Sequence, residues 1–520
     1  MCPCCDWMVQ TPRSTMRSTI LSARIGASAE SCCRDAIRFD IVVARCRVRD
    51  WVRGDDFGVR DVMRLYLIIG IAALSGGLMG AQPILPEPPA GQEVVPDFGA
   101  LIPHHDPVAQ STPVRLERVT AGVPWPRGLV FVDGDLIVLA RGRHRGNGGV
   151  GQDVDDQAGT LYRIDLSISE PVVKDQPAGE RVRNNATVLA RPTNPPFRSY
   201  DRTNPPEGDT LMTRPYCGLA FDPVSRNLFV CAFAGGELSN PTRFRKHATD
   251  GVFRFDLRTN AWSTVEQHDH GVVSADEVGS VIPNTYYPHH DPATNPPPHG
   301  WLNGVNGCAV VGDYLYAVAK DNHVVVAYPL AEIRANPAAP PPGGRVVVSR
   351  SVTLTHPGGQ MRTDLLGTCA VARHEGFLYV GYRTSSVVVR FPIDETGMVI
   401  PDSPAELIAV FEPWNRETRR SGDMFDIAFS PAGEMFVSMS RNGRVWRIGK
   451  PDPARPFNAN DALDRPTTAP PFVDLTPLLG KRLTASNIAV SADNYLYICT
   501  RANDRGEGNI FGTIYRVKLD

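Results

Sequence analysis

Three amide or carboxylate side chains, Asn306, Asp426 and Asn487, lie at two adjacent positions of a repeated pattern of short strands. Each falls near the start of a strand-like apolar run, where small or apolar residues are otherwise expected. Side-chain oxygens of these types coordinate hard cations and hydrogen-bond ligands. We therefore treat the three as candidate catalytic and metal-binding residues. The alternative is that they cap strand ends and bind water inside the fold.

Basic side chains make a second candidate set. An arginine or lysine ends the second strand in five copies of the repeat, at Arg141, Lys320, Arg383, Arg441 and Arg501. Arg127 joins them because it aligns with Asn306 at the start of the first strand. Several positive charges around one opening attract anions, and guanidinium groups bind carboxylates in a bidentate fashion. These residues are predicted to bind a ligand, unless each pairs with an acidic neighbour such as Asp321 or Glu375.

A histidine-rich stretch at 266–301 offers an alternative metal site. The candidate ligands there are His268, His270, His289, His290 and Asp291. Imidazole and carboxylate groups suit a borderline ion such as zinc. The spacings match no standard zinc motif, and histidines are common in exposed Pro-rich loops. An ordinary surface loop is therefore favoured over a metal site.

The repeat that carries these residues predicts the fold. Residues 306–328 show it most clearly, as three β-rich runs separated by a turn at Gly312-Asp313 and another at 320–322. Further copies begin near residues 128, 218, 367, 425 and 486. Each small sheet can bury its faces only against its neighbours, so six such copies predict an all-β, six-bladed β-propeller.

The two ends of the repeat region are predicted to meet. The last copy supplies only three strands before the sequence reaches Asp520, whereas a propeller blade needs four. Residues 113–120 alternate between apolar and polar side chains and precede the first copy. We expect this segment to complete the last blade as its outer strand, which removes an open sheet edge.

Aligning the six copies places each residue of the inner strand. One position holds Arg127, Cys217, Asn306, Gly367, Phe425 and Ser486, and the next holds Gly128, Gly218, Gly307, Thr368, Asp426 and Asn487. The alignment also makes Cys308 equivalent to Cys369, and Cys231 equivalent to Cys499. Those four places are apolar in other copies, so buried thiols are expected there rather than a disulfide framework.

The residues before the repeats predict export. A basic start at Met63-Arg64, a short apolar run and small residues up to Ala81 are typical of a secretory signal peptide at 63–81. Residues 1–62 are then a disordered extension that the native product lacks, and residues 82–112 a Pro-rich linker. The propeller spans 113–520, in the periplasm or outside the cell. The alternative is a genuine tail followed by a membrane anchor at 65–81, although that run is short for a membrane span.

Charge and motifs exclude several classes of function. The net charge of −2 gives no case for nucleic-acid binding. The sequence contains no nucleophile elbow, phosphate loop, dinucleotide fingerprint or haem attachment motif. We expect a monomer with no stable membrane span.

The repeats, with Arg-Val-Trp-Arg-like third strands, resemble six-bladed propellers of the NHL-repeat and gluconolactonase-like senescence-marker group at the level of fold. Gly122-Val123-Pro124-Trp125 is similar to the Glu-Gly-Pro-x-Trp opening of the gluconolactonases. Asn306-Gly307 resembles their Asn-Gly metal-ligand position, and Asp426 their acidic partner. The opening glutamate is absent, with Ala121 and Gly122 in its place.

Two hypotheses for function follow. In the first, the propeller binds a small anionic or sugar-like ligand at the top of its channel, either without catalysis or as a hydrolase or lyase that uses a divalent metal, calcium or zinc. In the second, the same face is a non-catalytic scaffold for a protein or a cell-wall polymer. Metal retained through purification would favour the first, and a metal-free protein that captures one partner would favour the second.

Overall fold

The computed structural model describes residues 98–101, 114–141, 159–173, 176–192, 217–232, 249–269, 304–320, 323–336, 344–411, 424–440, 442–459, 471–479, 485–500 and 512–519. The chain divides into two compact units, Met1–Glu87 and Pro88–Asp520, and every described residue belongs to the second. The predicted extension 1–62 and signal peptide 63–81 lie outside the described residues. No helix within the described segments is long and apolar enough to cross a membrane.

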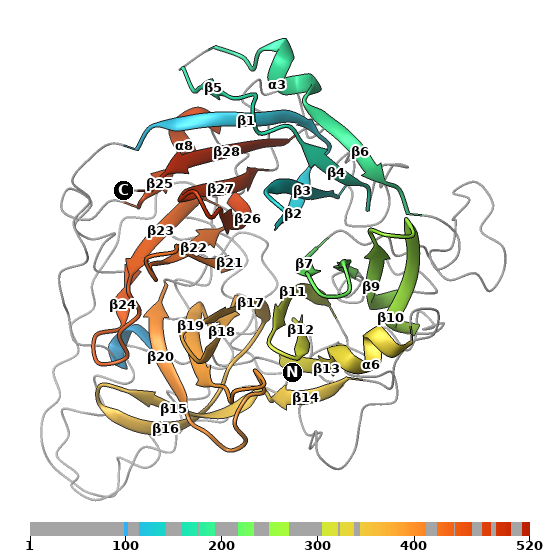
Figure 1. Ribbon diagram of the computed structural model, residues 1–520. Coiled ribbons are helices and arrows are strands. Elements are labelled where there is room, and N and C mark those ends of the chain that lie inside the picture. The colour runs from blue at the N-terminus through green and yellow to red at the C-terminus, as the bar shows by residue number, and fades with distance from the viewer. Residues whose placement is uncertain are drawn as a thin grey trace, which may run out of the picture. The chain divides into compact units, whose positions relative to one another are not determined.

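The described residues of the second unit form six sheets (Figure 1), and we number them in chain order. Sheet 1 contains β2 (Pro126–Val132), β3 (Asp135–Ala140), β4 (Leu161–Ile164) and β6 (Ala186–Ala190). Sheet 2 contains β7 (Leu219–Asp222), β8 (Asn227–Ala232), β9 (Thr249–Asp256) and β10 (Ala261–Asp269). Sheet 3 contains β11 (Val305–Val311), β12 (Tyr314–Ala319), β13 (Val324–Pro329) and β14 (Arg345–Val348).

The second half of the repeat region builds the other three sheets. Sheet 4 contains β17 (Thr368–His374), β18 (Phe377–Tyr382), β19 (Val387–Pro392) and β20 (Ala405–Val410). Sheet 5 contains β21 (Met424–Phe429), β22 (Met435–Met439), β23 (Arg444–Gly449) and β25 (Val473–Asp474). Sheet 6 contains β26 (Ala485–Val490), β27 (Tyr495–Thr500), β28 (Gly512–Lys518), β1 (Leu116–Val123) and β5 (Glu170–Pro171). Short helices α3 (Glu180–Asn184), α6 (Leu330–Ala335) and α8 (Thr476–Leu479) lie between strands.

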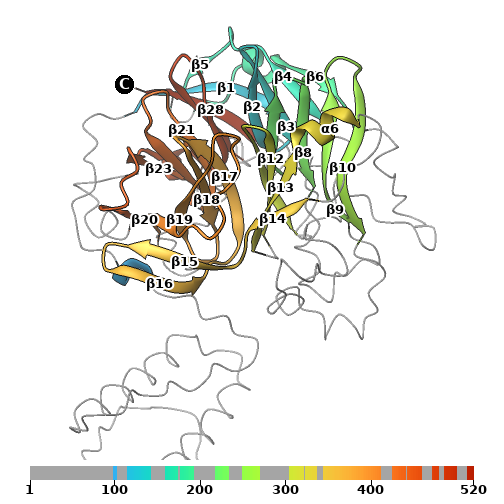
Figure 2. The same cartoon turned by 60° about the horizontal axis from the view of Figure 1, so that its bottom comes forward.

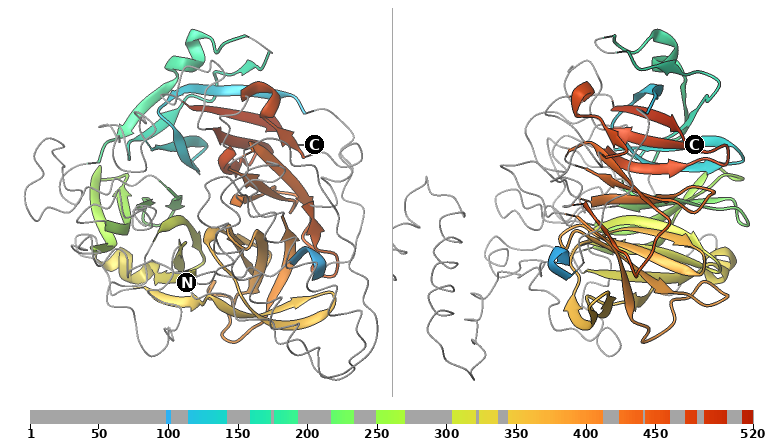
Figure 3. Two further views of the ribbon diagram at one scale, coloured as in Figure 1. Left: turned by 180° about the vertical axis from the view of Figure 1, so that it is seen from behind. Right: turned by 90° about the vertical axis from the view of Figure 1, so that its left-hand side faces the viewer.

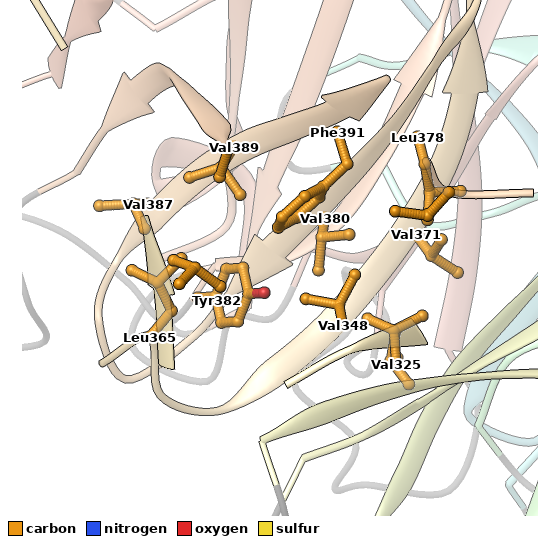
Figure 4. Close-up of a cluster of buried hydrophobic side chains, with 14 of the residues drawn as sticks. Val325, Val348, Leu365, Val371, Leu378, Val380, Tyr382, Val387, Val389 and Phe391 are labelled. Atoms are coloured by element: carbon orange, nitrogen blue, oxygen red, sulfur yellow. The ribbon is translucent and has the colours of Figure 1, made fainter. Parts of the chain in front are cut away.

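The first strands of the six sheets form a closed ring. They contact one another in the cycle β2, β7, β11, β17, β21, β26 and back to β2. One apolar cluster lies between each pair of neighbouring sheets. Figure 4 shows the cluster between sheets 3 and 4, where Val325 and Val348 lie near Val371, Leu378 and Val380. The protein is therefore the all-β propeller that the repeats predict, with one sheet for each of the six copies.

The composition of the strands explains why neighbouring sheets stack. In β12 every residue from Leu315 to Ala319 is buried, and β18 is buried from Leu378 to Tyr382. A strand covered on both faces needs a continuous apolar run instead of an alternating one. Burial of apolar surface contributes roughly 25 cal/mol per Å2 to folding, so these central strands carry much of the stabilisation. No sheet has enough apolar surface of its own, and the ring supplies the rest.

The predicted closure of the last blade is confirmed. Strand β1 pairs antiparallel with β28, with Leu116 opposite Val517 and Val123 opposite Gly512. The strand covers Leu116–Val123 instead of the predicted 113–120, because the repeated apolar pattern continues into the residues that lead directly to β2. Strand β5 then pairs with the other edge of β1.

Sheet 4 carries additions that the repeat does not predict. A hairpin of β15 (Ser351–His356) and β16 (Gly359–Asp364) pairs through β15 with β20 in parallel, and β24 (Phe457–Asn458) also pairs with β20. The short 3-10 helix η2 (Phe98–Leu101) lies beside this hairpin in the views of Figures 2 and 3. Phe98 is buried in the cluster between sheets 3 and 4, so the predicted linker contributes a residue to the core.

The start of the histidine-rich stretch is strand instead of loop. Strand β10 continues to Asp269, and His268 lies opposite Asp250 of β9 in the ladder. The predicted loop boundary at residue 266 is therefore wrong by a few residues. Gln267 and His268 keep the polar character of a loop, but the pairing with β9 overrides it. Residues 270–303, which include His270, lie outside the described part of the chain.

Candidate functional site

A β-bulge lies near the start of five of the six inner strands, β2, β11, β17, β21 and β26. In β2 Pro126 lies opposite Ala140 and Gly128 opposite Leu139, so Arg127 is the extra residue. Comparable register shifts place Asn306, Cys369 and Phe425 at the extra position of β11, β17 and β21. In β26 the shift lies between Ala485 and Ile488. A bulge turns one side chain away from the regular alternation and is often found next to functional sites.

The bulges correct the sequence alignment of the fourth copy. Gly367 precedes β17 and does not occupy the bulge. The residue of β17 that is equivalent to Arg127 and Asn306 is Cys369, two residues later. Cys308 is likewise not equivalent to Cys369, because it lies past the bulge, opposite Ala317. Sequence alignment missed this because Gly-Thr-Cys-Ala-Val at 367–371 resembles Asn-Gly-Cys-Ala-Val at 306–310, although the strand pairing offsets the two runs by two residues.

A repeated backbone hydrogen bond determines the position of three of the predicted basic residues. The N–H groups of Arg141, Lys320 and Arg383 donate to the carbonyl groups of Trp125, Gly304 and Gly367, at 2.9, 3.0 and 2.7 Å. The three accepting residues all have positive φ, at 46°, 71° and 75°. The three basic residues are therefore equivalent, as predicted, and each lies beside the start of an inner strand. Arg441 and Arg501 lie outside the described residues.

Trp125 belongs to this group, although the sequence analysis named it only as part of the motif at 122–125 and not as a site residue. A bulky side chain at positive φ is uncommon and strained. Its indole ring is buried, and the guanidinium carbon of Arg141 lies 4.1 Å from the ring centre. A tryptophan where two other copies have glycine was the available signal. The stacking places Arg141 over Trp125 at the entrance to β2.

Asp426 lies at the centre of a hydrogen-bonded cluster contributed by neighbouring sheets. Its Oδ2 accepts from the Asn487 side-chain amide and from the Ile488 N–H, both at 3.0 Å, and its Oδ1 accepts from the Ile427 N–H at 2.9 Å. Burial raises the pKa of Asp426 to about 6, although these three hydrogen bonds and the charge of Arg127 act in the opposite direction. A carboxyl group with a pKa near neutrality can hold or release a proton under ordinary conditions.

Arg127 and Asn487 complete this cluster, which we call the Asp426 cluster. The Arg127 side chain is buried, and its guanidinium carbon lies 4.3 Å from the centre of the Phe425 ring. The side chain of Asn487 is also buried, and its Oδ1 has no hydrogen-bond partner among the described residues. An acceptor buried without a partner is unfavourable by about 1–3 kcal/mol. The cluster therefore presents an acceptor, a titratable carboxyl group and a positive charge together.

The remaining predicted residue of the polar set, Asn306, faces a different neighbour. Its side-chain amide donates to the carbonyl oxygen of Cys369 at 3.1 Å, which links the bulge of β11 to that of β17. The structure thus brings Asp426, Asn487 and Arg127 together across sheets 5, 6 and 1. Asn306 lies in the same layer of the ring, between sheets 3 and 4.

The donors of the Asp426 cluster do not fit a divalent cation as they stand. The single carboxylate accepts three N–H groups, and the positive charge of Arg127 lies close enough to act on it. Calcium and zinc sites need several anionic or neutral ligands directed at the ion. No group of three or more His, Cys, Asp or Glu residues in the described segments could hold a metal. His289, His290 and Asp291 lie outside those segments, so the alternative site there stays a prediction.

Comparison with known proteins gives similarity of fold. No family model matches the chain, and no curated protein matches it. Among solved structures, the PQQ-bound aldose sugar dehydrogenase of Streptomyces coelicolor is 15% identical, with a TM-score of 0.40 over 79% of this chain and 100% of that one. A gluconolactonase of Xanthomonas campestris is 12% identical, with a TM-score of 0.36 over 81% of this chain and 96% of that one. A luciferin-regenerating enzyme is 10% identical, with a TM-score of 0.37 over 78% and 95%.

Proposed function

We propose that this protein is an exported propeller that binds a small, hydroxyl-rich anion at the Asp426 cluster. The observation that carries the proposal is the buried Oδ1 of Asn487, which has no partner among the described residues although it lies beside a titratable carboxyl group. Binding sites combine a concave setting with a few convergent polar groups. A ligand hydroxyl would satisfy this acceptor.

Each group of the cluster supports one feature of the ligand. The Asn487 oxygen calls for a hydrogen-bond donor, which a sugar-like hydroxyl supplies. The Arg127 guanidinium favours an anionic group such as a carboxylate. Asp426 accepts from hydroxyls when ionised and can donate when protonated, because its pKa is about 6. A polyhydroxylated carboxylate meets all three requirements.

The basic residues at the strand ends support electrostatic attraction of the ligand. Arg141, Lys320 and Arg383 occupy equivalent places beside the inner strands and are partly exposed. Charges of one sign around an opening raise the local concentration of an anion. Because these charges are partly solvated, salt screens them within about 8–10 Å. Affinity should therefore decrease as ionic strength rises.

Catalysis is a further step in the same proposal. A carboxyl group poised near neutral pH can act as a general acid or base toward an ester or lactone. The donors of the cluster do not fit a divalent ion as they stand, so this acid–base step does not rely on one. Metal analysis of the purified protein decides whether one is held. The alternative remains a scaffold that uses the same face for a protein or a cell-wall polymer.

Calorimetric titration tests the binding proposal with three probes that separate its requirements. D-gluconate carries hydroxyls and a carboxylate, D-glucose carries hydroxyls alone, and acetate carries a carboxylate alone. D-gluconate should bind more tightly than either of the others, and less tightly at 0.5 M than at 0.05 M salt. Hydrolysis of D-glucono-1,5-lactone, measured with and without added calcium or zinc, tests the catalytic branch.

Variants of the cluster make the test specific. Asn487→Ala and Arg127→Met should each weaken D-gluconate binding about tenfold or more, since a lost hydrogen bond to a ligand corresponds to ~1.4 kcal/mol per decade of affinity. Arg373→Met is the matched control, an exposed arginine near the other end of an inner strand. Equal affinity in all four proteins, or no binding of any probe by a folded protein, would contradict the proposal.

A further inference from the structure

Sheets 2 and 3 approach each other closely at two glycines. A Cβ atom added to Gly218 would lie 2.6 Å from the Gly307 Cα and 2.7 Å from the Cys308 nitrogen. Real side chains do not make contacts of this length, so the sequence needs glycine at residue 218 for the two inner strands to meet. The backbone of Cys308 therefore rests directly on the backbone of the chain entering β7.

The same contact brings three cysteines into one cluster. Cys231 in β8 donates its N–H to the Gly218 carbonyl at 3.0 Å, and Cys217 donates its N–H to the Cys231 carbonyl at 3.1 Å. The Cys308 Sγ lies 3.7 Å from the carbonyl oxygen of Phe229, two residues before Cys231 in the same strand. Cys217 and Cys231 belong to the apolar cluster between sheets 2 and 3, and Cys308 packs against it.

The thiols of Cys231 and Cys308 also interact with each other. Burial, as the larger cause, and the nearby Cys308 thiol, as a smaller one, keep the pKa of the Cys231 thiol well above its usual value. Cys231 is fully buried, whereas Cys308 is partly exposed. Neither is disulfide-bonded in this structure. Cys308 is thus the more exposed of the two, and its Sγ lies against β8, the strand that carries Cys231.

We propose that Cys231 and Cys308 form a reversible disulfide that joins sheet 2 to sheet 3 when the protein meets a small-molecule disulfide. Neighbouring propeller sheets are held by side-chain packing and not by shared strands. A covalent bond between β8 and β11 would tie two of them directly. The two residues are far apart in sequence, so the bond would close a long loop of the chain, which is the case in which a cross-link restricts the unfolded state most.

The exchange balances as two thiol–disulfide steps. The Cys308 thiolate attacks one sulfur of oxidised glutathione, forms a mixed disulfide and releases one glutathione thiolate. The Cys231 thiol then loses its proton and attacks the Cys308 sulfur, which releases the second glutathione. Two protein thiols are oxidised and one external disulfide is reduced to two thiols. Because the pKa of Cys231 is raised, the second step should accelerate as the pH increases above neutrality.

Peptide mapping of the whole purified chain tests the proposal. The protein is incubated with oxidised glutathione at pH 8.5 without denaturant, remaining thiols are alkylated, and the trypsin digest is analysed without reductant. Cleavage after Arg226, Arg243 and Arg258 separates Cys217, Cys231 and Cys308 into three different peptides. We expect a linked pair that contains Cys231 and Cys308, two hydrogens lighter than the sum of its peptides and absent after reduction.

Variants and melting curves provide independent checks. Cys308→Ser should abolish the linked pair, while Cys369→Ser, which can keep bonding to the Gly381 and Met424 carbonyls, should leave it intact. Oxidation should raise the melting temperature of the unmodified protein by several degrees, and reduction should reverse the shift. A disulfide-linked peptide pair that contains Cys217 in place of Cys231 or Cys308 would overturn the proposal. So would alkylation of both Cys231 and Cys308 after prolonged oxidation of the folded protein.

Discussion

Asp426 gives the protein a dependence of stability on pH that the sequence alone does not indicate. Its pKa is about 6 in the fold against 3.8 in an unconstrained chain, and burial is the main cause. Between those two values the folded protein keeps a proton that the unfolded chain has released. The free energy of unfolding should therefore decrease as the pH rises from about 4 to about 6, and the contribution of this group should be constant above that.

Asp426→Asn tests this expectation, since an amide cannot titrate. The difference in unfolding free energy between the original protein and the variant should decrease by about 1–3 kcal/mol across that interval. Urea unfolding at a series of pH values measures this difference.

Asp222→Asn is a control for which the pH dependence of stability should have the opposite sign. Burial would raise the pKa of Asp222, but hydrogen bonds from Arg334, Ser225 and Val224 outweigh it and hold the pKa low. The stability that Asp222 contributes should be lost only as the pH falls below about 4. Two curves of the same sign would contradict the assignment.

Sequence reasoning found part of the Asp426 cluster. Asp426, Asn487 and Arg127 stood out because polar side chains are unusual at the start of inner strands, and the structure brings these three together. The partners of each side chain were not predictable. Phe425, beneath Arg127, and Trp125, beneath Arg141, reach their places through a bulge and a positive-φ residue. These local departures from strand geometry leave only weak signals in a sequence.

The third strand carries an arginine at an equivalent position in five of the six sheets. Positions in the third strand are equivalent when they lie opposite equivalent residues of the second strand. The arginines at this position are Arg163, Arg254, Arg390, Arg447 and Arg516, and sheet 3 has Ala327 there. Three of them lie between an aromatic ring and a glutamate. Arg447, for example, bonds Glu434 through two nitrogens and lies 5.7 Å from the Phe472 ring centre. A repeated position of this kind stabilises a sheet from within.

Arg447→Met should lower the free energy of unfolding by about 1–3 kcal/mol, because it removes a paired, partly buried charge and leaves Glu434 without that partner. Arg163→Met is the matched control. Arg163 occupies the same position, but it and its partner Asp135 are 54% and 49% exposed. Its loss should change stability by less than about 1 kcal/mol. Denaturant unfolding compares the two, and equal effects would show that position alone, and not burial of the pair, determines the contribution.

At the scale of the whole molecule, stability should depend on closure of the ring by β1. Removing residues 1–123 takes away the strand that pairs with β28 and exposes one face of the cluster between sheets 6 and 1. We expect a large decrease in melting temperature and a tendency to associate through the open edge. Removing only residues 1–113 isolates the effect, because it keeps β1 and loses η2. If both truncated proteins melt at the same temperature, β1 does not carry the closure.

The overall fold was predictable because the sequence contains the strand pattern of one blade several times. Each copy shows the same order of apolar runs and turns, and errors in one copy are corrected by the others. The insertions were not predictable in the same way. The β15–β16 hairpin occurs once, pairs in parallel with β20, and has no second example in the sequence with which it can be compared. The 3-10 helix that carries the buried Phe98 likewise has no counterpart in the other copies of the repeat.

Pairing of β1 with β28 also determines when the protein can finish folding during its synthesis. Ribosomes make β1 first among the described strands and β28 last. At roughly 5–20 residues per second, tens of seconds separate the two. Through that interval β1 lacks its partner strand and the sheet 6 side of the cluster around Val119 and Val123, both fully buried in the finished protein. A nascent chain of this protein is thus an expected client of chaperones until its final strand emerges.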